Sequence, residues 1–353
     1  MSCKHKYKSN KILYNKIKDW RLNTKGEWSL IKCNRCDLIF LHPKPTKQSF
    51  QEIYPNNYYT HIREKAKEIS KIKKYILYKI INAIIAQYGY KNSNENFIEI
   101  SNKKLNGFNI NNNYLYYIAG KILKIIPLLE DLIVRKIMFI KGPAKGIHLD
   151  IGCGNGWLLD RTRNLGWNVL GIEPDPKAAN QAKKINIDIV GNKIENANIK
   201  ESSITIITIR HVIEHVEDPS SLLKQCFKLL KPHGKLIIIT PNIESLGYKK
   251  FKKYWRDIDS PRHLYLFSIK TLKNILIENN FSIKKLRTSS PSAYKMFIIS
   301  NNIKRFKKYS IDCNIFIKIK SFFFTIKEEL LRLFIKNAGE ELLAIAVKNE
   351  KSK

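Results

Sequence analysis

The chain has 353 residues, of which 44% are hydrophobic and 11% aromatic, so it can bury the core of one large domain with additions or of two domains. This composition excludes a disordered tail. The formal net charge of +34 indicates an anionic partner, such as nucleic acid, a phospholipid surface or a phosphorylated substrate. Lys, Asn, Ile and Tyr are plentiful along the whole chain, as an AT-rich coding sequence would make them, so a basic surface without a specific partner is the alternative.

Targeting signals are absent from the sequence pattern. No stretch reaches the roughly 18–20 consecutive apolar residues of a membrane span, so we expect no transmembrane segment. The start, M-S-C-K-H-K-Y-K, lacks the apolar stretch of a secretory signal. The six cysteines do not have the dense, even spacing of a disulfide scaffold, which fits a reducing compartment. We therefore expect a cytoplasmic protein, with peripheral attachment to a membrane as an open alternative.

The first 140 residues divide into two segments of different character. Residues 1–60 contain two Cys-bearing stretches followed by H-P-K-P-T and Y-P-N-N-Y-Y, a pattern that predicts turns and short strands. Residues 61–140 carry Ile, Leu and Tyr at spacings of three and four among Lys residues, with few Gly or Pro, which predicts helices.

From Gly146 onward, apolar strands alternate with helices. We expect strands at 146–152, 168–175, 187–191, 204–212, 235–242, 281–289 and 341–349. Near-continuous apolar strands separated by helices predict an α/β fold, a Rossmann-like doubly wound sheet that is covered on both faces. An apolar and basic segment at about 291–338 interrupts this order and is expected to be an inserted helical lobe.

A glycine-rich turn follows the first of these strands. In L-D-I-G-C-G-N-G-W at 149–157, the glycines stand between a strand and a helix, where they allow a tight turn and bring backbone N–H groups close to a ligand. Glu173 lies 19 positions after Gly154 (173 minus 154), at the end of the second strand, where a carboxylate can accept hydrogen bonds from both hydroxyls of a ribose. Asp150 would repel a pyrophosphate but suits a cationic ligand, which favours S-adenosylmethionine over a dinucleotide.

These stretches, with G-I-E-P-D at 171–175, I-R-H-V-I-E-H-V-E-D-P at 209–219 and D-S-P-R-H-L-Y-L-F-S at 259–268, resemble the class I S-adenosylmethionine-dependent methyltransferases. C-N-R-C-D-L-I-F-L-H-P-K-P-T at 33–46 is similar to the cysteine-bearing, zinc-ribbon-like N-terminal segment of one subfamily. That subfamily is often associated with sugar, glycan or other small-molecule acceptors. The resemblance implies seven strands, the last antiparallel, in a methyltransferase domain at 141–353.

The resemblance also implies a cofactor site. Its residues would be Asp150, Gly152, Cys153, Gly154, Glu173, Asn192 and His211. Asn192 stands where the family usually has an Asp that binds the adenine amino group, and its side-chain oxygen could accept the same bond. The backbone near His211 would flank the cofactor.

The letters His211-x-x-Glu214-His215 match the H-x-x-E-H motif of a zinc protease. That motif needs a helix at His211, whereas I-T-I-I-T-I-R-H-V predicts a buried strand. The similar quinone O-methyltransferases carry E-x-x-E-H here, associated with a divalent cation, and His211 replaces the first of those acids. Local hydrogen bonding that shapes the loop is the other interpretation.

Acceptor chemistry is assigned to the loop after the fifth strand and to His211. The resemblance and the loop's position predict His263 and His211 as catalytic, with His263 as general base or substrate-binding group. Arg256, Arg262 and Tyr265 are the expected substrate-binding residues, the arginines gripping an anionic part of the acceptor. The alternative is a structural lid held by Trp255 and Tyr265.

Three partners remain open at this point. A small-molecule or glycan acceptor is the first choice. The interleaved basic and aromatic residues of K-K-F-K-K-Y-W-R at 249–256 favour RNA as the second. Basic and aromatic helices within 61–140 and 300–335 could contact an anionic membrane. A non-enzymatic basic binding protein that keeps the fold is the alternative from another class.

Cys33-x-x-Cys36 is half of a zinc ribbon. Cys3 and His5 could complete a zinc site, although this first knuckle is short. A degenerate ribbon without metal is the alternative.

Overall fold

The computed structural model describes residues 10–45, 87–90, 134–142 and 145–349, together with single residues at 53, 121 and 131. Most of the predicted helical segment 61–140 lies outside these residues, as do Cys3 and His5. The chain forms two compact units. Unit 1 comprises residues 1–58, 209–228 and 238–353, and unit 2 comprises residues 59–208 and 229–237.

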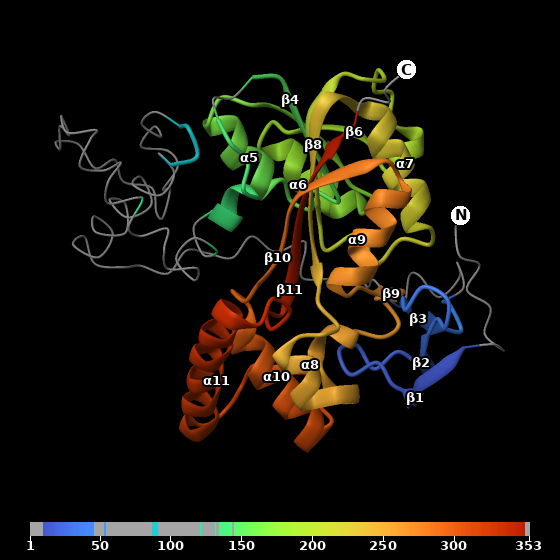
Figure 1. The fold of residues 1–353 in the computed structure, drawn as a ribbon, viewed down its shortest axis with the longest axis vertical. Coiled ribbons are helices and arrows are strands. Elements are labelled where there is room, and N and C mark those ends of the chain that lie inside the picture. Colours follow the sequence, from blue (N-terminus) through green and yellow to red (C-terminus); the bar gives the residue numbers. More distant parts are fainter. Residues whose placement is uncertain are drawn as a thin grey trace. The chain divides into compact units, whose positions relative to one another are not determined.

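Seven strands form a mixed sheet in the order β10-β11-β8-β7-β4-β5-β6 (Figure 1). The strands are β4 (Ile147–Ile151), β5 (Asn168–Ile172), β6 (Asp188–Gly191), β7 (Ile204–Arg210), β8 (Leu230–Pro241), β10 (Phe281–Ser289) and β11 (Glu341–Lys348). β4, β5 and β6 pair in parallel, whereas β10 and β11 pair antiparallel. The predicted α/β, Rossmann-like fold with seven strands is confirmed.

The apolar runs form the strands because both faces of the sheet need apolar side chains. In β7, Ile204, Ile206, Ile207 and Ile209 are all buried, and so are Leu236 to Ile239 in β8. β8 begins at Leu230, five residues before the predicted start at 235 (235 minus 230). Residues 231–233 are exposed, so hydrophobicity gave no sign of them.

The helices begin where the sequence provides capping residues. They are α5 (Trp157–Asn164), α6 (Pro176–Lys184), α7 (Pro219–Leu229), α8 (Leu246–Phe251), α9 (Ile269–Glu278), α10 (Ala293–Phe306) and α11 (Ile315–Phe334), with 3₁₀ turns η5 (Arg135–Ile137), η6 (Ile194–Asn196), η7 (Lys252–Tyr254) and η8 (Arg256–Ile258). The Asp175 carboxylate accepts from the first backbone N–H groups of α6, and Ser268 forms a capping box with Thr271 in α9.

The N-terminal residues form a second, four-stranded sheet within unit 1. Its order is β1 (Lys11–Ile17), β2 (Trp28–Lys32), β3 (Ile39–His42) and β9 (Tyr265–Leu266). β9 was not predicted, because two residues carry no periodic pattern. The antiparallel pairs Ile39–Leu266 and Phe40–Tyr265 join the Cys-bearing segment to the loop that contains His263.

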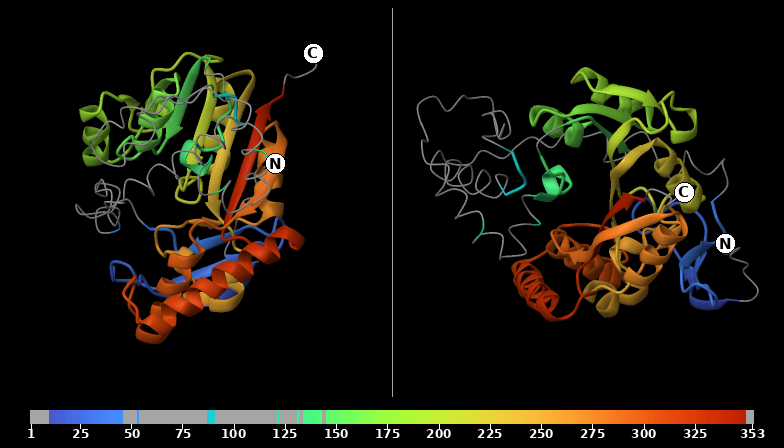
Figure 2. Two further views of the ribbon diagram at one scale, coloured as in Figure 1. Left: turned by 90° about the vertical axis from the view of Figure 1, so that its left-hand side faces the viewer. Right: turned by 45° about the horizontal axis from the view of Figure 1, so that its top comes forward.

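α10 and α11 lie between β10 and β11 in the chain and pack against each other in unit 1 (Figure 2). The rings of Phe297 and Phe324 are 5.0 Å apart, and Ser321 Oγ donates to the Tyr294 carbonyl at 2.7 Å. Within the described part of the chain, no helix combines the length and the apolar character that a membrane crossing requires.

Candidate functional site

The glycine turn of unit 2 leaves space for a ligand at its middle glycine. Gly152, Gly154 and Gly156 have φ values of 71°, 57° and 76°, in the left-handed region that favours glycine. The N–H groups of Gly152 and Cys153 donate to the Ile172 carbonyl at 2.8 and 3.1 Å, which fastens the turn to the end of β5. A Cβ atom on Gly154 would meet nothing within 4 Å. The turn therefore presents Gly154 to open space at the start of α5.

Glu173 is fixed beside this turn. It follows β5 directly and is 8% exposed. Its Oε2 accepts from the Gly154 N–H at 2.7 Å, and its Oε1 accepts from the Asp175 N–H at 2.9 Å. Two backbone donors thus hold one carboxylate in a single orientation next to the open position.

A buried hydrogen-bond chain orients the second carboxylate, Asp150. Thr208 Oγ1 donates to Asp150 Oδ1 at 2.5 Å, and His148 Nε2 lies 2.9 Å from Thr208 Oγ1. Because the Thr208 hydroxyl has only one proton, His148 Nε2 must be the donor to Thr208. His148 Nδ1 then faces the Thr162 hydroxyl at 2.9 Å. Burial lowers the pKa of His148 to about 3, so the ring is neutral.

The sequence did not predict that His148 and Thr208 orient Asp150. The available signal was a polar residue in the middle of each apolar strand, I-H-L in β4 and I-I-T-I in β7. Such a buried polar residue usually has a hydrogen-bond partner.

Open space over Gly154, flanked by Asp150 and Glu173, fits a cofactor that carries a ribose and a positive charge. Asn192 follows β6 directly and is exposed, with its Oδ1 3.5 Å from Asn196 Nδ2. The roles of Gly152, Gly154, Glu173, Asp150 and Asn192 toward the cofactor stay predictions.

Cys153 does not suit the predicted role. Its side chain is 3% exposed and packs in a core cluster with Leu159, Ala182 and Ile187. Its N–H donates to Ile172 and its carbonyl accepts from the Gly156 N–H at 3.0 Å. Burial raises the pKa of the thiol. With every polar group of Cys153 engaged inside the fold, we no longer expect it to contact the cofactor.

In unit 1, His211 is held between two carboxylates. It takes a left-handed φ of 53° just after β7. Its Nδ1 is 3.3 Å from Glu214 Oε1 and its Nε2 is 3.4 Å from Glu341 Oε1, and its side chain is 31% exposed. Burial opposes protonation, but these two carboxylates outweigh it and raise the pKa of His211. Burial would likewise raise the pKa of Glu214, yet its hydrogen bond to His211 and the neighbouring histidines lower it to about 2.

The H-x-x-E-H letters occupy the turn between β7 and α7, not a helix. His211 and His215 therefore do not share a helical face, and the zinc-protease interpretation is excluded.

Glu214, His215 and His263 are the group of potential metal ligands found among the described residues, with one ligand atom of each within 4.8 Å of the others. The Nδ1 atoms of His215 and His263 donate to the carbonyls of Arg262 at 3.0 Å and Asp257 at 2.7 Å. This orientation would suit a divalent transition metal. Glu214, however, already accepts from Thr240 at 3.0 Å and bonds to His211. Local hydrogen bonding accounts for the cluster without an ion.

The other predicted catalytic residue, His263, is 6% exposed. Its ring lies 4.7 Å from that of His215, and its Nε2 lies 4.0 Å from Asp259 Oδ2. His211 is thus the more accessible of the two predicted histidines.

Arg262 is not available to an acceptor. Its side chain is 0% exposed, and its guanidinium pairs with Asp19 at 2.6 Å and Asp259 at 2.8 Å. The prediction that Arg262 grips an anionic substrate is therefore replaced by a structural role, joining the N-terminal segment to the 259–268 loop.

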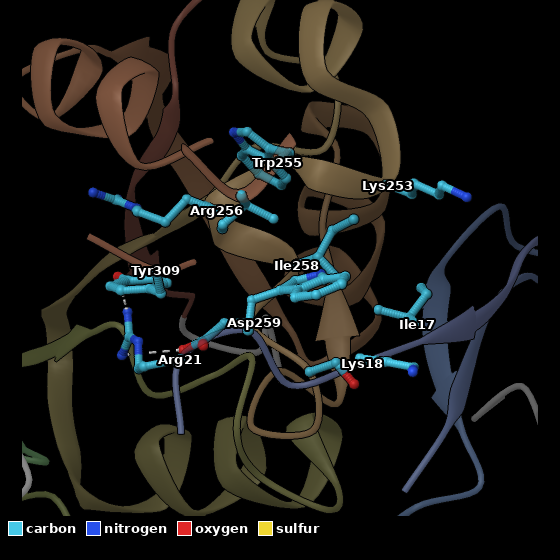
Figure 3. Close-up of a pocket in the computed structure, with 12 residues that line it drawn as sticks. Ile17, Lys18, Arg21, Lys253, Trp255, Arg256, Ile258, Asp259 and Tyr309 are labelled. Atoms are coloured by element: carbon cyan, nitrogen blue, oxygen red, sulfur yellow. Dashed lines mark hydrogen bonds and ion pairs between the residues drawn. The ribbon is translucent and has the colours of Figure 1, made fainter. Parts of the chain in front are cut away.

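Arg256 and Arg21 border a shallow pocket in unit 1 (Figure 3). Arg256 pairs with Asp257 at 2.8 Å, and Arg21 bonds to Tyr309 and pairs with Asp259 at 3.2 Å. Of the two predicted arginines, Arg256 lines this pocket and Arg262 does not.

Tyr265 and Trp255 support the structural-lid alternative for this loop. The Tyr265 hydroxyl donates to the Glu217 carbonyl at 2.9 Å and accepts from Lys44 Nζ at 2.8 Å. Trp255 Nε1 donates to Glu340 Oε2 at 2.9 Å, and its side chain is 1% exposed. Both side chains are buried, so we no longer expect Tyr265 to bind substrate.

Cys33 is buried and Cys36 is half-buried in the turn between β2 and β3. Since Cys3 and His5 lie outside the described residues, the zinc site stays a prediction, which metal analysis of protein purified without chelator would test.

Comparison with known proteins connects this geometry to a family. Residues 125–286 match the family model of a methyltransferase domain. The chain is 32% identical over 107 residues to a ubiquinone biosynthesis O-methyltransferase of Xanthomonas axonopodis, a match that covers 28% of this chain and 45% of that protein. It is 32% identical over 128 residues to the protein of the same name from Coxiella burnetii, covering 34% and 52%. The chain thus spans about half the length of the curated relatives it matches.

Two solved structures align with this chain at lower similarity. A SAM-dependent methyltransferase of Archaeoglobus fulgidus aligns over 67% of this chain and 100% of its own, with 18% identity and a TM-score of 0.42. Phosphoethanolamine N-methyltransferase 2 of Haemonchus contortus, in complex with S-adenosyl-L-methionine, aligns over 68% and 59%, with 17% identity and a TM-score of 0.42. Residues 125–286 are thus similar to a methyltransferase domain, and strands β4 to β8 of the seven-stranded sheet lie within that match.

Proposed function

We propose that this protein transfers a methyl group from S-adenosylmethionine to a small-molecule acceptor. The observation that carries the proposal is the glycine turn, in which Gly154 faces open space and donates its N–H to the fixed Glu173 carboxylate, with the buried Asp150 carboxylate on the strand that leads into the turn. Glu173 would accept hydrogen bonds from the ribose hydroxyls. Asp150 would face the cationic methionine end of the cofactor. When bound, S-adenosylmethionine supplies an electrophilic methyl group on a sulfonium.

The proposed acceptor class rests on the curated relatives and on the N-terminal segment. The curated relatives are O-methyltransferases of ubiquinone biosynthesis, which favours an oxygen of a small molecule. Sugar and glycan acceptors belong to the same proposal, because the cysteine-bearing N-terminal segment resembles the subfamily associated with them. The chain's part in catalysis would be to position the acceptor, exclude water and take up its proton.

Cofactor binding tests the proposal. We expect calorimetric titration of the full chain with S-adenosylmethionine to show binding, and Glu173→Gln to weaken it about 10- to 100-fold, because a charge-assisted hydrogen bond contributes about 1.5–3 kcal/mol. Glu195→Gln is the matched control, since Glu195 is an exposed acid in η6 of the same unit.

If the unaltered chain binds no S-adenosylmethionine, the proposal fails and a basic binding protein that retains the fold takes its place. If both variants bind equally well, Glu173 is not the ribose partner.

We further propose that His211 takes up the acceptor proton. His211→Gln should lower turnover about 100-fold or more while leaving the affinity for S-adenosylmethionine unchanged. Turnover of the unaltered chain should rise with pH through the raised pKa of His211, above 6.5, because only the neutral ring can accept a proton. His263→Gln, at a buried histidine, is the comparison. A pH profile that keeps its shape in His211→Gln would contradict this role.

RNA remains the second candidate acceptor because the net charge is +34. In 249–256, however, the side chains of Phe251 and Trp255 are 4% and 1% exposed, so they cannot stack on bases. We expect bulk RNA to bind weakly, with an affinity that salt abolishes, and not to be methylated. Methylation of RNA that persists at high salt would reverse this order.

A further inference from the structure

α11 carries a continuous band of exposed apolar side chains. Nine large apolar residues on this helix are between 40% and 84% exposed, namely Ile315, Phe316, Ile319, Phe322, Phe323, Ile326, Leu330, Leu333 and Phe334. At about 100° per residue, they fall within an arc of about 120° that contains no polar residue. Single exposed apolar residues are common, but a contiguous surface of this kind usually marks an interaction site. We call it the apolar stripe.

The opposite face of α11 fixes the direction of the stripe. Ile317, Ser321, Phe324 and Glu328 are buried. Phe324 packs against Phe297 of α10, and Arg332 donates to the Thr288 carbonyl at 2.8 Å. The helix is therefore held in one rotation, in which the stripe lies on the face of α11 opposite the buried residues that pack toward α10.

Basic residues border both edges of the apolar stripe. By the same helical spacing, Lys318 lies along one edge and Lys320 and Lys327 along the other, and all three are exposed. Glu329, the acid beside the stripe, is engaged by Arg332, whose Nη1 lies 2.8 Å from both of its carboxylate oxygens. The margins of the stripe are thus positively charged.

This combination identifies the partner by its chemistry. An apolar face flanked by lysines fits a helix that lies in the plane of a membrane, with its lysine side chains extended to the headgroups. α11 is about 30 Å long, and it does not have the composition of a span. A second copy of the chain is a poorer partner, because stripe-to-stripe contact would place lysine margins together in a chain of net charge +34. We propose that the apolar stripe docks this protein on an anionic phospholipid surface.

The test is flotation of the full chain with phospholipid vesicles. We expect binding to an equimolar mixture of phosphatidylglycerol and phosphatidylcholine, little binding to phosphatidylcholine alone, and weakening by salt. Phe316→Ser, Phe323→Ser and Phe334→Ser together should lower binding to the mixed vesicles by at least about tenfold. The matched control is Ile277→Ser, because Ile277 is 51% exposed on α9, outside the stripe. Lys318→Glu, Lys320→Glu and Lys327→Glu together should also lower it by at least about tenfold.

Tryptophan fluorescence gives a second readout that does not need the triple phenylalanine-to-serine variant. The emission of Phe323→Trp should shift to the blue when mixed vesicles are added, and its melting temperature should match that of the unaltered chain. No shift and no flotation would overturn the proposal and indicate that part of this chain covers the stripe. Sedimentation that shows a dimer, which the triple phenylalanine variant converts to monomer without any vesicle binding, would overturn it in favour of a second copy.

Discussion

Arg262→Met is expected to lower the free energy of unfolding by about 3–5 kcal/mol, the usual cost of removing one partner of a buried ion pair. The Arg262 side chain is 0% exposed and pairs with Asp19 and Asp259. Burial alone would raise the pKa of Asp19, but the hydrogen bond and charge of Arg262 outweigh it and lower that pKa. For Asp259, burial is likewise outweighed by Arg21 and Arg262, and the pKa is lowered. Without the guanidinium, Asp19 loses its counter-charge, and Asp259 keeps Arg21 but loses its hydrogen bonds to Arg262.

Urea unfolding followed by circular dichroism measures this loss. Arg35→Met is the control, because Arg35 is exposed on the β2–β3 turn, and it should change the free energy of unfolding by less than about 0.5 kcal/mol. Adding Asp19→Asn to Arg262→Met should restore part of the stability, since the amide removes one unpaired charge. A loss below about 1 kcal/mol for Arg262→Met would show that water or another cation replaces the guanidinium.

The second large effect is a contribution to stability that falls as the pH rises from about 5 to 8, by on the order of 3 kcal/mol. Its source is a pair of buried carboxyls, Glu328 of α11 and Glu340 just before β11. Burial raises the pKa of Glu340 to about 7, and burial with the charge of Glu340 raises the pKa of Glu328 well above its usual value.

The sign follows from proton binding. The folded state keeps a proton on the pair that the unfolded state releases above pH 4.5. The stability that this pair contributes is therefore greatest below that pH and is lost as the pH rises toward 7 and beyond. Glu340 accepts from the Gly247 N–H at 2.7 Å and from Trp255 Nε1 at 2.9 Å, and these two donors stabilise its ionised carboxylate. We place the shared proton on Glu328.

Glu328→Gln should remove most of this pH dependence, because an amide replaces the protonated carboxyl without titrating. Glu329→Gln is the control at the next position, and it should keep the slope of the unaltered chain. The difference between the two profiles of stability against pH isolates the contribution of the Glu328–Glu340 pair, because His148 and His215 contribute equally in both variants. Parallel profiles for both variants would contradict a shared proton.

The sequence predicted the sheet well because its strands are buried. In β7, four isoleucines within six residues (204–209), rich in β-branched side chains and bounded by turns, favour a buried strand. The strand–turn–helix arrangement around Gly154 was also predicted, because it depends on local backbone geometry. Asp150 and Glu173 were named from their places at the ends of two neighbouring strands, and their roles toward a cofactor stay predictions.

Long-range pairing could not be predicted in this way. Arg262 looked like an anion-binding residue because its motif lies in a loop, but its partner Asp19 is 243 residues away. Tyr265 belongs to β9, whose two residues pair with a strand from the N-terminal segment. The apolar residues of α11 predicted a helix, but the pattern alone could not tell which of its two apolar faces would be covered.

The neutral ring of His148 has a consequence for the response of this protein to acid. His148 does not change its charge between about pH 4 and 8, because it titrates near 3. The hydrogen bond from His148 to Thr208 therefore keeps its direction over this range. His211, in the other unit, has a raised pKa because of Glu214 and Glu341. Under the role proposed for His211, acidification would slow acceptor chemistry without altering the donor that His148 offers to Thr208.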